Sequence, residues 1–173
     1  QVSYVGYAPL GPVLAIMPWN FPFWQVLRCA IGAIAAGNVV VLKHAPNVQG
    51  CAAAIVDLVR DAGAPSGVLQ NLRVDTDAVG ELIHDHRIAA VALTGSTRAG
   101  AAVAAEAGAA LKPCVLELGG SDPYLIFEDA DIPAAVDACV AARFANSGQS
   151  CIAAKRFIAV DAIYQEVRER LHE

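Results

Sequence analysis

Three residue types suited to covalent carbonyl chemistry occur far apart in the sequence. Cys151 ends the run NSGQSC, Glu117 lies in LELGG, and Asn20 lies in PWNFP. A cysteine thiolate attacks a carbonyl carbon, an amide N–H stabilises the oxyanion that forms, and a glutamate activates water for hydrolysis. Glycine or proline flanks each segment, and these residues let the backbone turn sharply beside a reacting group. We predict that folding brings the three side chains to one reactive centre.

Each of these residues also has a purely structural interpretation. Asn20 could brace a turn between the prolines on either side of it, and Glu117 could be a buried carboxylate with a charged partner. A glutamate inside an otherwise apolar VLEL strand is costly to bury, which favours a function or a partner. A cysteine hydrolase would need a histidine beside Cys151. None of the four histidines stands in a motif that suggests one.

The composition favours a folded protein that acts without nucleic acid, membrane or metal. The chain has 173 residues, of which 56% are hydrophobic and 17% charged, and its formal net charge is −5. It has no cluster of Lys and Arg to bind nucleic acid. The longest apolar stretch, residues 29–42, contains Asn38 and is shorter than the roughly 20 residues that a membrane span needs.

Three sequence features indicate where in the cell the protein is expected and whether it binds a metal: its cysteines, its histidines and its first residues. The five cysteines form no C-x-x-C pair, the four histidines lack the spacing of metal ligands, and QVSY does not resemble an export signal. Reduced thiols are typical of such a pattern. We therefore expect a cytoplasmic protein with no metal site.

Short β-branched runs alternate with alanine-rich stretches along the chain. Asn47 is placed to cap a helix from residue 48, and Gly37, Asn38 and Gly63 are placed to end helices. We predict strands at residues 13–17, 39–43, 68–72, 88–94, 115–118, 124–127 and 155–160, and helices at 25–36, 48–62, 78–84, 97–107, 132–146 and 163–172. This alternation predicts an α/β fold with a parallel sheet, in which ligands bind beyond the carboxyl ends of the strands. Residues 95–100 form a turn that would begin a helix at such a strand end. The free N–H groups of this turn could bind a pyrophosphate, or the turn could be an ordinary capped helix start.

Five segments together resemble a known family. PWNFP, VVVLK, TGSTRAG, LELGG and GQSC occur in the order used by NAD(P)-dependent aldehyde dehydrogenases, and the finer detail is most similar to bacterial succinate-semialdehyde dehydrogenases of the Sad/YneI type. The resemblance implies a Rossmann-like parallel sheet with flanking helices, in an incomplete aldehyde dehydrogenase fold. Family members are much longer, so the chain is expected to be a fragment. Residues 1–119 would be most of the cofactor-binding domain, and residues 120–173 the start of the catalytic domain.

The resemblance also implies a role for individual residues. Cys151 would be the nucleophile, Asn20 and the Cys151 backbone N–H would stabilise the oxyanion, and Glu117 would activate the hydrolytic water. Lys43 would reach the adenosine ribose of NAD or NADP, and Ser96 its pyrophosphate. Many NAD-preferring members have an acidic residue at the position of Pro46, so NADP should be tolerated here. The residues implied to bind the cofactor are Ile16, Met17, Pro18, Trp19, Lys43, Ala45, Pro46, Gly95, Ser96, Leu118 and Gly119.

The substrate class depends on Arg28, eight residues after Asn20. Some semialdehyde dehydrogenases have an arginine here that binds the distal carboxylate of the substrate, which implies a small aldehyde acid such as succinate semialdehyde. An ordinary surface arginine is the alternative. Relatives that acylate coenzyme A or reduce acyl phosphates generally lack the glutamate at position 117, so its presence argues against those two activities. An inactive fragment that only binds nucleotide is a further alternative: we expect the isolated chain to be inactive and a full-length relative to be a homo-oligomer.

Overall fold

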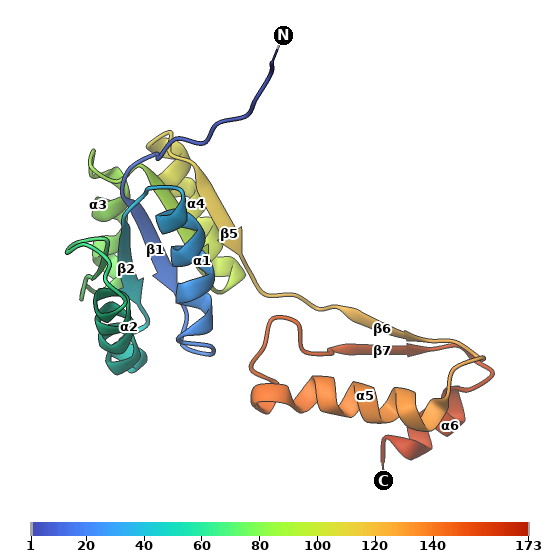
Figure 1. The fold of residues 1–173 in the computed structure, drawn as a ribbon. Coiled ribbons are helices and arrows are strands. Elements are labelled where there is room, and N and C mark those ends of the chain that lie inside the picture. Colours follow the sequence, from blue (N-terminus) through green and yellow to red (C-terminus); the bar gives the residue numbers. More distant parts are fainter. Residues whose placement is uncertain (1, 173) are drawn as a thin grey trace. The chain divides into compact units, whose positions relative to one another are not determined.

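A computed structural model describes residues 2–172. The chain forms two compact units, Gln1–Leu118 and Gly119–Glu173. Every predicted helix and strand is present, with ends that move by one or two residues. The first unit contains β1 (Val13–Met17), α1 (Trp24–Ala35), β2 (Val40–His44), α2 (Gln49–Asp61), β3 (Leu69–Asn71), α3 (Val79–His84), β4 (Ala90–Thr94), α4 (Thr97–Ala109) and β5 (Cys114–Glu117) (Figure 1).

The five strands of the first unit form one parallel sheet in the order β3-β2-β1-β4-β5. This is the doubly wound order of dinucleotide-binding folds, in which the chain reverses its direction of travel across the sheet between β1 and β4. Residues at the ends of neighbouring strands pair in register: Ile16 with Lys43, and Thr94 with Glu117. The carboxyl ends therefore share one edge, where such folds bind ligands.

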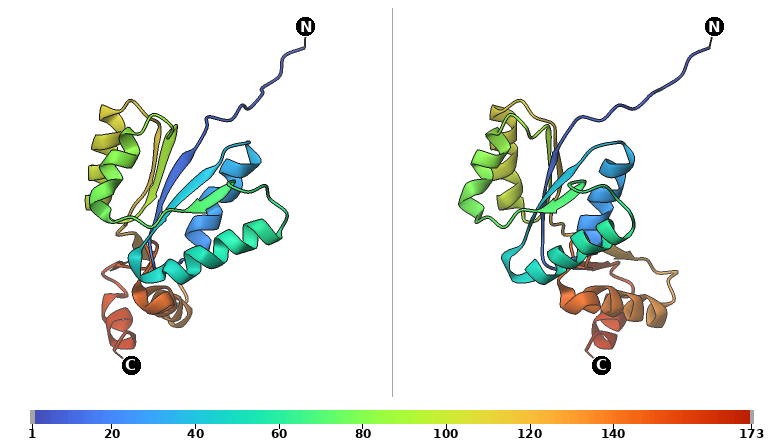
Figure 2. Two further views of the ribbon diagram at one scale, coloured as in Figure 1. Left: turned by 90° about the vertical axis from the view of Figure 1, so that its left-hand side faces the viewer. Right: turned by 60° about the vertical axis from the view of Figure 1, so that its left-hand side comes forward.

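Helices cover both faces of this sheet, and the strands are apolar on both sides. Ala15 and Met17 pack in a cluster with residues of α1 and α2, whereas Leu14 packs in a second cluster with residues of α3 and α4. Successive residues of β1 therefore enter opposite cores, as the period of a strand requires. Figure 2 shows the sheet between the two helix pairs.

The helix ends follow the predicted signals with one exception. Gly37 and Gly63 adopt positive φ angles of 86° and 89° directly after α1 and α2, which glycine tolerates without strain. The prediction that Asn47 caps a helix is wrong. Asn47 lies inside a 3₁₀ turn, Pro46–Val48, that leads into α2, and no side chain caps either helix start. Pro46 favours this turn because its ring restricts φ to helical values.

The second unit has its own small core. It contains β6 (Pro123–Ile126), α5 (Ile132–Phe144), β7 (Arg156–Ala159) and α6 (Tyr164–Arg170). The strands β6 and β7 pair in parallel as a separate sheet, so the predicted strands are divided over two sheets. The side chain of Asp131 caps α5 by accepting from the Ala134 N–H at 3.1 Å. Within residues 2–172, no helix has the length and apolar character to cross a membrane.

Candidate active and cofactor site

Most of the predicted site residues lie at or just beyond the carboxyl edge of the five-stranded sheet. Asn20 follows β1, Lys43 is the penultimate residue of β2, and Glu117 ends β5. Gly95 and Ser96 follow β4 and lead directly into α4. Residues that are far apart in the sequence are thus gathered along one edge because parallel strands present their ends on the same side.

Lys43 lies near this edge, and 7% of the residue is exposed. Among the described residues no carboxylate pairs with its ammonium group. Lys43 can therefore donate hydrogen bonds to a ligand that carries hydroxyl or phosphate oxygens. Its neighbour Pro46 is exposed and provides no negative charge to repel a phosphate.

The start of α4 presents free backbone donors at the same edge. Ser96 is the N-cap, and its Oγ accepts from the Ala99 N–H at 3.2 Å. The remaining N–H groups of the first turn lack helical partners and carry the positive end of the helix dipole. One turn on, a Cβ added to Gly100 would lie 2.5 Å from Leu118 Cδ2. Glycine at this position lets Leu118 pack directly on the helix.

His44 braces the loop that carries Asn20, a role that the sequence analysis missed. The ring is 1% exposed. Its Nε2 donates to the Pro22 carbonyl oxygen at 3.0 Å, and its Nδ1 lies 3.0 Å from the Ala45 N–H. These contacts tie the segment after β1 to the end of β2. The signal available in the sequence was a histidine directly after the buried VVVLK strand.

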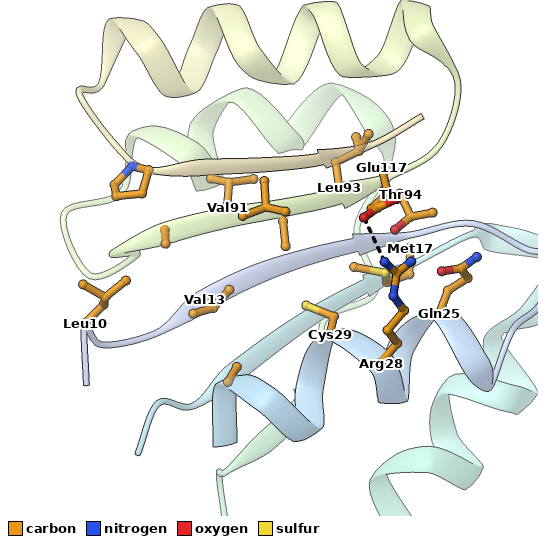
Figure 3. Close-up of a pocket in the computed structure, with 15 residues that line it drawn as sticks. Leu10, Val13, Met17, Gln25, Arg28, Cys29, Val91, Leu93, Thr94 and Glu117 are labelled. Carbon is orange, nitrogen blue, oxygen red and sulfur yellow. Dashed lines mark hydrogen bonds and ion pairs between the residues drawn. The ribbon is translucent and has the colours of Figure 1, made fainter. Parts of the chain in front are cut away.

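A pocket of about 350 Å³ lies on the α1 side of the sheet. Arg28 on α1 points across it toward Glu117 at the end of β5 (Figure 3). The Arg28 Nη2 donates to Glu117 Oε1 at 2.9 Å, and the two side chains are 51% and 50% exposed. The pocket is lined by Leu10, Val13, Met17, Gln25, Arg28, Cys29, Ala33, Ala90, Val91, Ala92, Leu93, Thr94, Pro113, Val115 and Glu117.

This arrangement corrects one interpretation of Glu117. The carboxylate is not buried, because β5 is the edge strand and Glu117 is its last residue, so half of the side chain reaches solvent. The partner of Glu117 is Arg28, the residue predicted to bind the substrate.

Burial raises the pKa of the neighbouring Cys29 thiol, so Cys29 stays protonated at neutral pH and supplies no negative charge to the pocket.

Gln25 is a second residue that the sequence analysis missed, and it lines the pocket. It is 7% exposed, and its Oε1 is buried without a hydrogen-bond partner. Gln25 lies three residues before Arg28 on α1, and residues at this spacing share one face of a helix. That spacing was the signal in the sequence. Figure 3 shows the amide beside the Arg28 guanidinium and directed toward the ends of the strands.

Cys151 lies in the second unit, in a turn with unusual backbone angles. Asn146 and Ser147 adopt φ angles of 52° and 57° in the 3₁₀ segment Ala145–Gly148 before it. Left-handed residues other than glycine are uncommon, and such strain clusters at functional sites. The Cys151 side chain is exposed. Its carbonyl oxygen accepts from Lys155 Nζ at 2.8 Å, which holds the turn in place.

The predicted site residues are thus distributed over the two units. Asn20, Glu117, Arg28 and Leu118 belong to the first, and Gly119 and Cys151 to the second. In the described part of the chain, no group of His, Cys, Asp and Glu is arranged to hold a metal ion. The second unit thus carries the thiol, and the first unit carries the carboxylate, the amide and the sheet edge at which such folds bind dinucleotides.

Comparisons with known proteins identify the family. The sequence matches the aldehyde dehydrogenase family over residues 1–173. It is 58% identical over 170 residues to the NAD(P)+ succinate semialdehyde dehydrogenase Sad of Escherichia coli strain K12, in an alignment that covers 98% of this chain and 37% of that protein. The probable NADP+ succinate-semialdehyde dehydrogenase of Synechocystis is 52% identical over 169 residues, with the same shares of 98% and 37%.

Solved structures agree with this assignment. Succinic semialdehyde dehydrogenase from Streptococcus pyogenes, in complex with NADP+, is similar with a TM-score of 0.91 at 41% identity, covering 95% of this chain and 36% of that one. The chain therefore belongs to the aldehyde dehydrogenase family, and the Rossmann-like α/β prediction is confirmed. It spans 37% of the length of the two curated relatives named above, so the prediction of a fragment is confirmed as well.

Proposed function

We propose that the protein carrying this chain oxidises succinate semialdehyde to succinate with NAD or NADP as the hydride acceptor. The observation that carries the proposal is the Arg28–Glu117 pair in the pocket. The Arg28 guanidinium already binds a carboxylate there, that of Glu117, which is also the residue proposed to act as base. A small aldehyde that ends in a carboxylate would match that charge, and the names of the similar proteins agree with this substrate class.

The first chemical step belongs to Cys151 and Asn20. The thiolate of Cys151 attacks the aldehyde carbon, and the oxygen becomes an oxyanion in a thiohemiacetal. The Asn20 amide and the Cys151 backbone N–H donate hydrogen bonds to that oxygen; removing one such donor typically slows a reaction by about 100- to 1,000-fold. His44 supports this step indirectly, since it holds the carbonyl of Pro22 two residues after Asn20.

The second step belongs to Glu117. Loss of hydride leaves a thioester on Cys151, and Glu117 takes a proton from water as the water oxygen bonds to the thioester carbon. The carbon–sulfur bond then breaks, and the thiolate leaves with the electron pair.

The residues at the sheet edge fit a dinucleotide. When bound, NAD or NADP supplies the site that accepts the hydride. Lys43 would donate to ribose hydroxyls, Ser96 and the start of α4 would receive the pyrophosphate, and Pro46 leaves room for a 2′-phosphate. Under this proposal residues 1–119 bind the cofactor and residues 120–173 begin the catalytic domain. An oligomer of the full-length protein and a cytoplasmic location remain part of the proposal.

The function is tested with a protein of full family length that carries this chain. We expect reduction of NAD or NADP with succinate semialdehyde in the absence of coenzyme A and phosphate. The Glu117→Gln variant should keep a burst of reduced cofactor and then turn over slowly, because the thioester forms but is not hydrolysed. An unchanged steady-state rate in this variant would reject the role of Glu117, and a requirement for coenzyme A would favour an acylating relative.

The substrate class is tested at Arg28. Charge-assisted hydrogen bonds contribute about 1.5–3 kcal/mol, so Arg28→Ala should reduce the preference for succinate semialdehyde over butanal by about 10- to 150-fold in kcat/KM. An unchanged preference would refute the choice of substrate while leaving the aldehyde dehydrogenase chemistry intact. The 173-residue chain alone should produce no reduced cofactor.

A further inference from the structure

The Arg28–Glu117 contact joins the only two formally charged residues among the described residues that line the pocket. The residues are 89 positions apart in the sequence, one on α1 and one at the end of β5, and their side chains meet at 2.9 Å. Figure 3 shows the contact beside Thr94 and Met17. Within the pocket each side chain is therefore the other's only counter-charge.

We propose that this ion pair is a resting contact that an anionic substrate exchanges. The distal carboxylate of the bound aldehyde acid takes the place of Glu117 on Arg28, and Glu117 is released to act as the base. The inference rests on the proposed function and extends it, because it assigns how substrate recognition controls hydrolysis. Arg28 is then a positioning residue for Glu117 in addition to its contact with the substrate.

The exchange requires little energy. Both side chains are half exposed, and such pairs shift an equilibrium by no more than about fivefold. Glu117 receives one hydrogen bond from Arg28, whereas a guanidinium holds a carboxylate best through two parallel bonds. Two carboxylates on one guanidinium repel each other. The substrate is also held by its covalent bond to Cys151, so Glu117 is the group that leaves.

Release matters because a general base must reach the proton that it removes. While Glu117 Oε1 accepts from Arg28, the carboxylate is held toward α1 and one of its oxygens is engaged. Once released, it can orient toward the hydrolytic water and accept its proton. A thioester derived from succinate semialdehyde keeps a carboxylate on Arg28 throughout hydrolysis. A thioester derived from butanal has no such group, so Glu117 returns to Arg28.

The thioester derived from succinate semialdehyde should therefore be hydrolysed faster than the one derived from butanal. A free carboxylate in solution should take the place of the distal carboxylate that the butanal-derived thioester lacks. The full-length protein is acylated with butanal, and loss of the acyl group from Cys151 is followed by rapid quench and mass spectrometry. Sodium acetate is compared with sodium chloride at equal ionic strength. We expect acetate to accelerate hydrolysis by about 2- to 5-fold without changing the rate of acylation.

Two variants complete the design. Arg28→Met removes the resting contact, so it should hydrolyse the butanal-derived thioester at the acetate-stimulated rate and show no response to acetate. Arg60→Met is the matched control, because Arg60 also pairs with exposed carboxylates, Asp57 and Asp61 on α2, but does not line the pocket. It should respond to acetate as the unmodified protein does.

The outcomes separate the inference from the function on which it rests. The exchange is refuted if acetate has no effect on the unmodified protein, or if Arg28→Met still responds to it. If Arg28→Met loses the preference for succinate semialdehyde but hydrolyses the butanal thioester at the unstimulated rate, Arg28 binds the substrate without controlling Glu117. If neither aldehyde acylates Cys151, the proposed function itself is wrong.

Discussion

His44 links two segments on which the proposed oxyanion site depends. The ring is buried at the end of β2, and its Nε2 donates to the Pro22 carbonyl oxygen at 3.0 Å. Replacing His44 with leucine keeps much of the buried volume but removes the donor. The Ala45 N–H still donates to the Met17 carbonyl oxygen at 3.0 Å, so the Pro22 carbonyl is the group that loses its partner.

The expected loss follows from that single unpaired group. A buried acceptor without a partner costs about 1–3 kcal/mol of unfolding free energy, and because the Pro22 carbonyl is partly buried we expect a loss of about 1–2 kcal/mol. With a urea m-value of about 1–3 kcal/mol/M, a loss of 2 kcal/mol lowers the urea midpoint by about 1 M. His44→Gln should recover at least half of the loss, because the glutamine amide nitrogen can occupy the position of Nε2 and donate to the same carbonyl.

Urea unfolding of the protein and both variants, followed by circular dichroism, measures these differences. In a protein of full family length, His44→Leu should also lower kcat more than it raises KM, since Asn20 would be less well held for the oxyanion. A loss of less than about 0.5 kcal/mol for His44→Leu would contradict the reasoning, because it lies below the expected loss of at least about 1 kcal/mol. So would a glutamine variant no more stable than the leucine variant.

Three further predictions concern stability. Asn38→Ala removes three hydrogen bonds between the side-chain amide and the backbone and should lower the unfolding free energy by about 2–4 kcal/mol, whereas Asn47→Ala, at an exposed position that caps no helix, should change it little. Leu111→Gly should raise the melting temperature through a gain of about 1 kcal/mol, because Leu111 has a φ of 54° and is 92% exposed; no gain would show that the angle is unstrained. Side-chain and backbone hydrogen bonds from Arg87 hold the pKa of Asp85 below its usual range, so this stabilisation is complete above about pH 5 and is lost as the pH falls below about 4. Arg87→Ala should therefore be less stable than the unmodified protein at neutral pH, and urea midpoints measured down to about pH 2 should converge; a gap that widens in acid would contradict this.

Local features of the sequence were enough to predict the elements. The apolar runs before Asn20 and Lys43 indicated the strands that carry them, and the glycines after α1 and α2 marked the helix ends. These signals depend on residues within one turn or one strand. The same reasoning failed at Asn47, where the fixed φ of Pro46 favoured a 3₁₀ turn over a capped helix start.

The sequence by itself determined the class of chemistry and the family. The thiol, carboxylate and amide and the order of their segments required no coordinates. Only the tertiary structure decided that Arg28 contacts Glu117 and that Glu117 is half exposed. It also decided that His44 holds the loop after β1. Each of these contacts joins segments whose proximity depends on strand order and on which face a helix covers, and no local pattern of residues encodes that choice.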